Sequence, residues 1–290
     1  MNAISPVSVT FDHILVPTDF SDTSLCALQY AKAIARRENS EILLVHVNQP
    51  TNPIPPPEAV WIDASELLKL QEEQLDQSGE ALRSEGFRAE AIWLAGEVQD
   101  EILSVVKHKK VDLIVQGTHG GRGLERFLAG SDAEAVLRHV LCPVLTLGPA
   151  IPDLLHAVWP PREVICATDL DPRSADIAAF AYSLARHHEA QFVLFHVDSP
   201  GQRQDVDWAA FDQAFREYVP GGLEAQSSLR TWLANTASGT LIVDLAKERR
   251  SDLIVMGART ASSIVTHLAR GTAVKVLAEA VCPVMTLHQS

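Results

Sequence analysis

The sequence predicts an α/β protein made of two tandem copies of one domain, each a parallel sheet with helices on both faces. Two observations predict this class. The segment His13 to Val47 resembles the segment Glu163 to Val197, at an offset of 150 residues. Short apolar segments alternate with helical patterns in both copies, which is typical of strands buried between helices. At about 150 residues per domain, a chain of 290 residues also suggests two domains.

The repeat continues to the end of each copy, at a shorter offset. Gly117 matches Gly257 and Cys142 matches Cys282, both 140 residues apart. The second copy has therefore lost about ten residues, in the stretch equivalent to the Pro-rich segment 49–61. A period this long indicates a duplicated domain rather than a solenoid. We expect a first domain at 1–148, a linker at 149–161 and a second domain at 162–290, because Pro and Gly bound the intervening stretch.

The elements of the first copy follow from residue spacing, taken in chain order. Apolar positions recur at helical intervals between Ser21 and Arg37, and Gly86 stops a later helix. In the second copy, Asp171 and Pro172 are a cap and a first helical residue. The strands are expected at 14–18, 42–47, 89–95, 112–117 and 143–147. The helices are expected at 21–37, 64–84, 100–108 and 131–139.

Right-handed crossovers between parallel strands leave few topologies for this order of elements. We expect five strands in the order 3-2-1-4-5, with the switch point between strands 1 and 4. Ligands bind outside the carboxyl ends of the strands at such a point. The last strands of the two copies, at 143–147 and 283–287, are natural edges to pair, so the copies are expected to form an intramolecular pseudo-dimer.

Composition excludes several classes of function. The formal charge of −13 disfavours binding to nucleic acid or to anionic membranes. No apolar run approaches 18 residues and the start has no signal-peptide pattern, so a cytoplasmic protein is expected. Four cysteines, without zinc-site spacing, agree with that. The sequence also lacks a P-loop, a G-x-G-x-x-G turn after strand 1 and a G-x-S-x-G elbow.

Two motifs fall at the expected switch point. Pro17, Thr18 and Asp19 end the first strand, and a glycine pattern G-x2-G-x9-G-S follows the fourth. Gly117 would let a ribose approach the backbone, because no Cβ stands in the way. Asp19 could accept hydrogen bonds from ribose or adenine, or help to hold a metal. The remaining glycines would turn amide groups toward an anion at a helix N-terminus, and the pattern is completed by Gly120, Gly130 and Ser131.

At these residues the chain resembles the universal stress protein (UspA-type) family in tandem form. The resemblance rests on ILVPTDFS, LLVHV, DLIVxGTHGGRGLxxxLAGSxAExVLRH and CPVL, and it covers nearly the whole chain. It implies Rossmann-like (adenine nucleotide alpha hydrolase-like) domains of order 3-2-1-4-5. It further implies dimerisation through the last strand, a regulatory role and, with this glycine pattern, binding of ATP, for which magnesium is an option.

The resemblance also transfers ligand contacts, residue by residue. Adenine and ribose would face Pro17, Thr18, Asp19 and the backbone of Val47. Ribose and phosphates would face Gln116, Gly117, Gly120, Gly130 and Ser131. His119 and Arg122 either reach a phosphate or lie in a solvated loop. Asp132, beside Ser131, suits the helix dipole but would repel a phosphate.

The second copy departs from the motif. Thr260, Arg270 and Gly271 stand where the first copy has Gly120, Gly130 and Ser131, and Ala167 replaces Pro17. The Arg270 side chain would fill the phosphate pocket, or its charge could pair with a phosphate. We expect one working site, in the first copy.

Three functions remain open from the sequence. The first is a regulatory stress protein that binds ATP or another adenine nucleotide. The second is a slow ATP hydrolase or autophosphorylating protein, although no catalytic residue can be assigned. The third is an interaction module without a ligand. A homodimer is an option for the whole chain.

The apolar surroundings of two histidines and of the cysteines predict core positions for His46, His196, Cys26, Cys142, Cys166 and Cys282.

Overall fold

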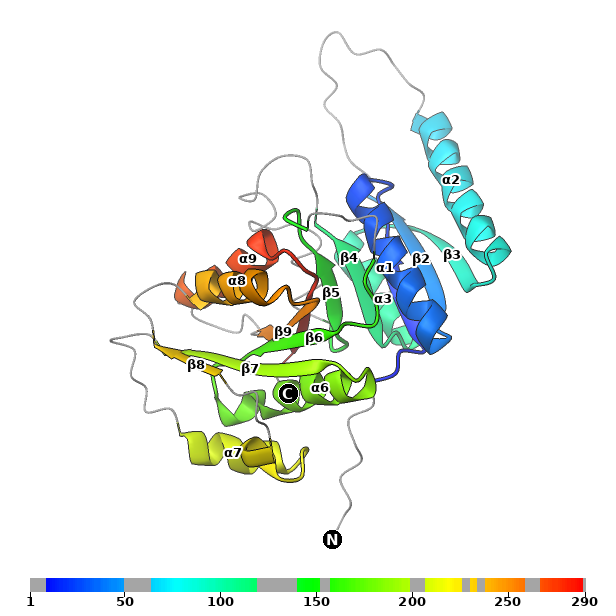
Figure 1. Ribbon diagram of the computed structural model, residues 1–290. Helices are drawn as coiled ribbons and strands as arrows, with labels where there is room; N and C mark the ends of the chain where they lie inside the picture. The colour runs from blue at the N-terminus through cyan, green and yellow to red at the C-terminus, as the bar shows by residue number, and fades with distance from the viewer. Residues whose placement is uncertain are drawn as a thin grey trace.

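The strands of both copies join in one ten-stranded sheet in the computed structural model (Figure 1). The structure describes residues 9–49, 64–118, 140–151, 157–198, 207–225, 230–233, 238–258 and 267–288. The strand order is β3-β2-β1-β4-β5-β10-β9-β6-β7-β8. Each half therefore has the predicted order 3-2-1-4-5. The strands are β1 His13–Pro17, β2 Glu41–Asn48, β3 Arg88–Ala95, β4 Leu113–Gly117, β5 Val144–Leu147, β6 Glu163–Ala167, β7 Gln191–Asp198, β8 Arg230–Leu233, β9 Leu253–Ala258 and β10 Val284–His288.

The two halves meet where their last strands pair. All strand pairs within a half are parallel, whereas β5 and β10 are antiparallel, with Leu145 opposite Met285. The predicted pairing of the final strands is thus confirmed. We call the contact region between the halves, on and around β5 and β10, the seam.

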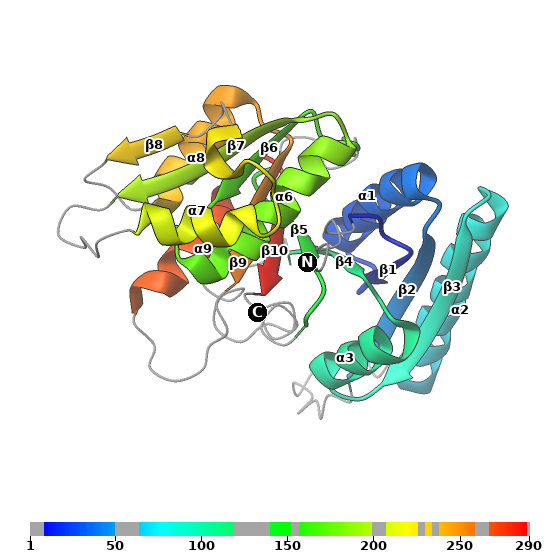
Figure 2. The ribbon, with the colours of Figure 1, turned by 90° about the horizontal axis from the view of Figure 1, so that it is seen from below.

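Helices cover both faces of the sheet (Figures 1 and 2). One buried cluster contains side chains from α1, α2, α6 and α7, and the other contains side chains from α3, α8 and α9. Both clusters extend across the two halves. The α-helices are α1 Asp22–Glu38, α2 Ala64–Ser84, α3 Val98–Lys109, α6 Ala175–His187, α7 Trp208–Arg216, α8 Ser238–Arg249 and α9 His267–Glu279. Two 3-10 turns are η1 Pro172–Ser174 and η2 Gly222–Ala225.

Successive strand residues enter opposite clusters, as the period of two requires. Ile14 lies in the first cluster and Leu15 in the second, and both side chains are fully buried. This two-sided burial explains why the strands read as continuous apolar runs rather than alternating ones.

The first helix of each half follows a polar capping residue, but the first turn differs between the halves. Ser21 caps α1 by accepting from the Ser24 amide, and Asn39 ends it in the left-handed conformation. In the second half, Asp171 caps a 3-10 turn that begins with Pro172, and α6 starts only at Ala175. The expected cap and proline are therefore confirmed, but the first turn they open is a 3-10 turn. The helix expected at 131–139 lies outside the described residues.

The core predictions hold with one correction. His46, His196, Cys26, Cys166 and Cys282 are buried as expected. Cys142 is only partly buried, because its Pro143 neighbour precedes β5 at a turn that reaches the surface. Among the described helices, none is both long and apolar enough to cross a bilayer.

The segment between the halves takes part in packing. Ile151 is buried, and the Trp159 ring lies 6.5 Å from the Phe11 ring, centroid to centroid. Gly148 follows β5 directly, and a Cβ there would overlap the carbonyl oxygen of Leu277 in α9. The first and second halves are therefore in backbone contact at the seam.

Candidate functional site

The candidate site lies at the carboxyl ends of β1 and β4. These strands are parallel neighbours, with Ile14 opposite Leu113. After β1 the chain passes through α1 to β2, which lies on one side of the β1–β4 pair, and after β4 it leads to β5, which lies on the other side. The strand order therefore reverses between β1 and β4, and such a topological switch point is where open α/β sheets bind ligands.

Thr18 fixes the path of the chain as it leaves β1. Its amide donates to the Val45 carbonyl at 2.8 Å, which extends the pairing of β1 with β2 by one residue. The buried hydroxyl lies 3.1 Å from the Ser24 hydroxyl and accepts from the Phe20 amide at 3.1 Å. These bonds tie the end of β1 to the first turn of α1.

His46 forms a hydrogen bond with the Thr18 carbonyl. Its Nδ1 lies 2.7 Å from that oxygen, and because a carbonyl can only accept, Nδ1 carries the proton. The imidazole lies between the rings of Phe20 and Trp93, each 4.8 Å away between centroids. His46 is therefore a satisfied core histidine that positions the backbone of the site, as its apolar surroundings predict.

Asp19 is exposed at the site, and its carboxylate is oriented by the start of α1. Oδ1 accepts from the Ser21 amide at 3.0 Å and from the Ser21 hydroxyl at 2.5 Å. The carboxylate thus supports the capping turn. Its exposure also leaves it accessible to a ligand.

Two contacts within the protein constrain the end of β4. A Cβ at Gly117 would overlap the carbonyl oxygen of Thr23, so the first turn of α1 already requires the glycine. The Gln116 side chain is buried and donates toward the Thr146 hydroxyl at 3.4 Å. A ligand at this edge would therefore meet the Gln116 backbone rather than its amide. Pro17 and Val47, at the ends of β1 and β2, are half-buried.

The rest of the glycine pattern lies outside the described residues. This holds for His119, Gly120, Arg122, Gly130, Ser131 and, beyond the pattern, for Asp132 and Thr260. Arg270 and Gly271 lie within α9. The structure thus brings together Pro17, Thr18, Asp19, Val47, Gln116 and Gly117.

The second half repeats the same scaffold. The Thr168 amide donates to the Phe195 carbonyl, and the Thr168 hydroxyl accepts from the Leu170 amide. The Thr168 carbonyl accepts from Nδ1 of His196 at 2.9 Å. Asp169 accepts from the Asp171 amide at 3.1 Å. Since this scaffold is present in both halves, it cannot by itself distinguish a working site. In sequence the halves differ at the glycine pattern and at Pro17, which Ala167 replaces.

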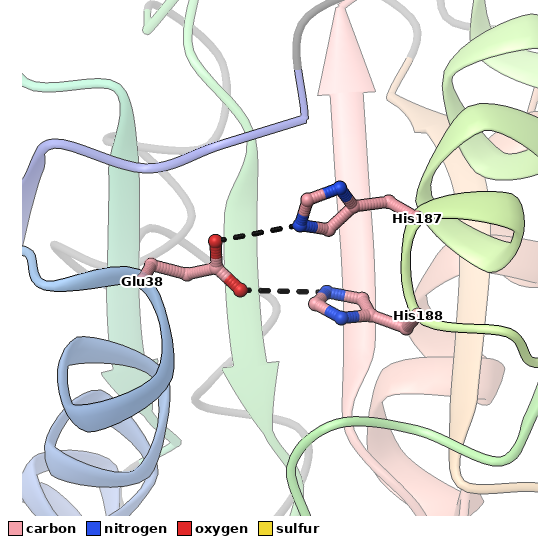
Figure 3. A group of neighbouring side chains, drawn as sticks. All are labelled: Glu38, His187 and His188. Carbon is pink, nitrogen blue, oxygen red and sulfur yellow. Dashed lines mark ion pairs between the residues drawn. The ribbon is translucent and has the colours of Figure 1, made fainter.

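A second group of polar residues escaped the sequence analysis. Glu38 ends α1, His187 ends α6, and His188 follows it (Figure 3). Their potential ligand atoms lie within 4.8 Å of one another. The adjacent histidines were the only local signal, because Glu38 is 149 residues away in the chain from the first of them.

Comparison with known proteins agrees with the fold and the duplication. The model of the universal stress protein family matches residues 10–147 and 161–288. Universal stress protein MJ0531 of Methanocaldococcus jannaschii is 37% identical over 139 residues, which cover 47% of this chain and 82% of that protein. Universal stress protein YxiE of Bacillus subtilis is 34% identical over 145 residues, covering 47% of this chain and 97% of that protein.

A solved structure resembles both halves at once. The crystal structure of a universal stress protein from Archaeoglobus fulgidus has a TM-score of 0.71 and covers 96% of this chain and 97% of its own. At 21% sequence identity, this likeness concerns the fold.

Proposed function

The chain belongs to the universal stress protein family, and we propose that its first half binds ATP or another adenine nucleotide and thereby acts as a cytoplasmic regulatory module. The nucleotide would set conformation or partner choice rather than drive rapid turnover. In this proposal residues 1–148 form the binding domain, 149–161 connect the halves, and 162–290 form a supporting domain.

One observation carries the proposal. The glycine pattern that starts at Gly117 is intact only in the first half, and Gly117 ends the strand that pairs with β1, after which the exposed Asp19 follows. The base and ribose would lie at the ends of β1 and β2, against Pro17, Thr18 and Val47. The phosphates would meet the amides that Gly120, Gly130 and Ser131 contribute, with His119 and Arg122 as further contacts. Asp19 would hold a magnesium ion, whose charge would offset that of the phosphates.

One contact favours a second candidate, slow phosphoryl transfer to Ser21. The Ser21 hydroxyl donates to Asp19 at 2.5 Å, which places a general base beside a hydroxyl group. In this reaction Ser21 Oγ would attack the γ-phosphorus of bound ATP, its proton would pass to Asp19, and ADP would leave. Phosphate on Ser21, found by mass spectrometry after incubation with Mg-ATP and lost in Ser21→Ala, would support it.

Calorimetric titration of nucleotide-stripped protein with Mg-ATP tests the main proposal. We expect a stoichiometry near one. Gly130→Arg, which copies the residue of the second half into the first, should abolish binding. Asp19→Asn should weaken binding, while its matched control Asp169→Asn should leave it unchanged. A stoichiometry near two would contradict the single site. Absence of heat, together with an unmoved thermal midpoint, would overturn nucleotide binding.

A further inference from the structure

Glu38, His187 and His188 meet at the seam, far along the chain from one another. Glu38 comes from the last residue of α1 in the first half, and the histidines come from the end of α6 in the second. In Figure 3 the two imidazole rings point toward the two oxygens of one carboxylate. Each half therefore contributes part of one polar cluster.

The distances within the cluster are too long for ordinary hydrogen bonds. His187 Nε2 lies 3.5 Å from Glu38 Oε2, and His188 Nε2 lies 3.8 Å from Glu38 Oε1. These two distances run to different oxygens of the carboxylate, and each is close to the distance of about 3.4 Å that separates two ligands of a tetrahedral ion with bonds of about 2.1 Å. With one ligand atom taken from each residue, all three atoms lie within 4.8 Å of one another, so the three residues are near enough to share an ion.

Two of the three side chains are buried and carry polar atoms without a hydrogen-bond partner. The His188 side chain has no exposed surface and that of Glu38 is 6% exposed. In the part of the chain that the structure describes, Glu38 Oε1 and both ring nitrogens of His188 have no hydrogen-bond partner. Buried polar atoms are nearly always paired in proteins, so these three unpaired atoms indicate that a ligand binds between them.

We propose that Glu38, His187 and His188 bind a divalent transition-metal ion, best matched by zinc, that links the two halves across the seam. Two imidazole nitrogens and one carboxylate oxygen are ligands that zinc prefers, and a water molecule would complete a tetrahedron. His187 is 39% exposed, so solvent can reach the fourth position. The Trp159 ring stands edge-on to the His188 ring, with 5.2 Å between the ring centroids.

This ion would act as a clamp between the halves rather than as part of the nucleotide site. The cluster lies at the ends of α1 and α6, whereas Asp19 and Ser21 lie at the opposite, N-terminal end of α1. Metal binding and nucleotide binding can therefore be measured separately, and either can fail without the other.

The test is titration of the full-length, chelator-treated protein with zinc chloride, by calorimetry and by thermal unfolding. We expect one zinc ion per chain and a higher thermal midpoint with zinc than without. When cobalt(II) replaces zinc, the protein should show the intense visible absorption of a four-coordinate cobalt ion. Glu38→Gln keeps the shape of the side chain, and His187→Ala changes a partly exposed residue, so both variants should fold.

Either variant should weaken zinc binding at least about tenfold. His108→Ala, on the exposed face of α3, is the matched histidine control and should bind zinc as the wild type does. The proposal is overturned if the wild type binds no stoichiometric zinc. It is equally overturned if zinc binds but Glu38→Gln and His187→Ala retain full affinity, since the ion would then bind elsewhere.

Discussion

Glu38 and His188 occupy equivalent positions in the two halves, 150 residues apart in the chain, and their side chains approach to 3.8 Å. The residues that follow them, Asn39 and Glu189, both adopt the left-handed conformation that ends the helix. The antiparallel pairing of β5 with β10 relates the halves by an approximate two-fold axis, and these two positions meet near it. In a symmetric dimer of identical copies, each residue there would meet itself. The duplicated chain instead places a carboxylate opposite an imidazole.

Two glycines should not tolerate a methyl group. At Gly117 the added Cβ would overlap the Thr23 carbonyl, and at Gly148 it would overlap that of Leu277. We expect Gly117→Ala and Gly148→Ala each to lower the free energy of unfolding by about 1–3 kcal/mol, because backbone must shift. Urea unfolding measures this, with Glu72→Ala on the exposed face of α2 as control. A wild-type midpoint for either glycine variant would contradict the close approach there.

Breaking an ion pair in the second half should cost far more than breaking the comparable pair in the first. Arg249 donates to both oxygens of Glu163, whose side chain is 12% exposed and also accepts from Ser251. Removing one partner of such a pair leaves a largely buried charge, so Arg249→Ala should cost about 3 kcal/mol.

The equivalent residue of the first half is Lys109, which pairs with Glu90 at the surface, where both side chains are more than 40% exposed. Lys109→Ala should cost less than about 1 kcal/mol. Chemical denaturation of both variants at low and moderate salt provides the comparison. Equal losses in the two variants would show that burial does not control the strength of these pairs.

The stability of the metal-free protein should fall in acid through His188. In the unfolded chain this imidazole binds a proton near pH 6.5, but in the folded protein its pKa is about 4. Between these values the unfolded state binds more protons, so stability decreases as pH falls from 6.5 to 4, and this contribution levels off below. Its full size is about 3 kcal/mol.

His188→Leu removes this titration and should flatten the pH profile of the unfolding free energy over that range. The groups facing His188 are Glu38 and Arg37 from α1 and His187 from α6, and they remain in the variant. His108→Leu should follow the wild-type profile. Parallel profiles for wild type and His188→Leu would mean that His188 takes up its proton in the folded state as readily as in the unfolded chain.

The four cysteines should react slowly in the native protein. Burial raises the pKa of Cys142, Cys166 and Cys282 to about 12, so little thiolate is present at neutral pH. Labelling with a chromogenic disulfide reagent should detect all the thiols only after unfolding. Because Cys142 is the partly exposed one, Cys142→Ser should remove the earliest native reaction. Rapid native labelling of Cys166 would contradict its full burial.

The sheet could be predicted because its signals are local or repeated. Buried runs such as Ile14–Leu15–Val16 identify strands, and the offset between Gly117 and Gly257 identifies the duplication. Those two features, together with the handedness of crossovers, led to the order 3-2-1-4-5 and to the pairing of β5 with β10. Both are confirmed.

The candidate site was less accessible to sequence reasoning. The role of Thr23 against Gly117 depends on how closely α1 approaches β4, which no spacing encodes. Cys142 looked like a core residue because it precedes an apolar strand, but its exposure depends on a surface turn. The meeting of Glu38 with His188 depends on the seam, so it becomes visible only once the halves are docked.

The pairing of β5 with β10 has a further consequence for how this protein responds to dilution. A sheet closed between separate subunits comes apart when their concentration falls, so its unfolding midpoint depends on that concentration. Here both strands belong to one polypeptide, and their local concentration is set by the connection between the halves. The ten-stranded sheet should therefore persist as a single chain at concentrations where a dimer would dissociate, with β3 and β8 as its outer strands.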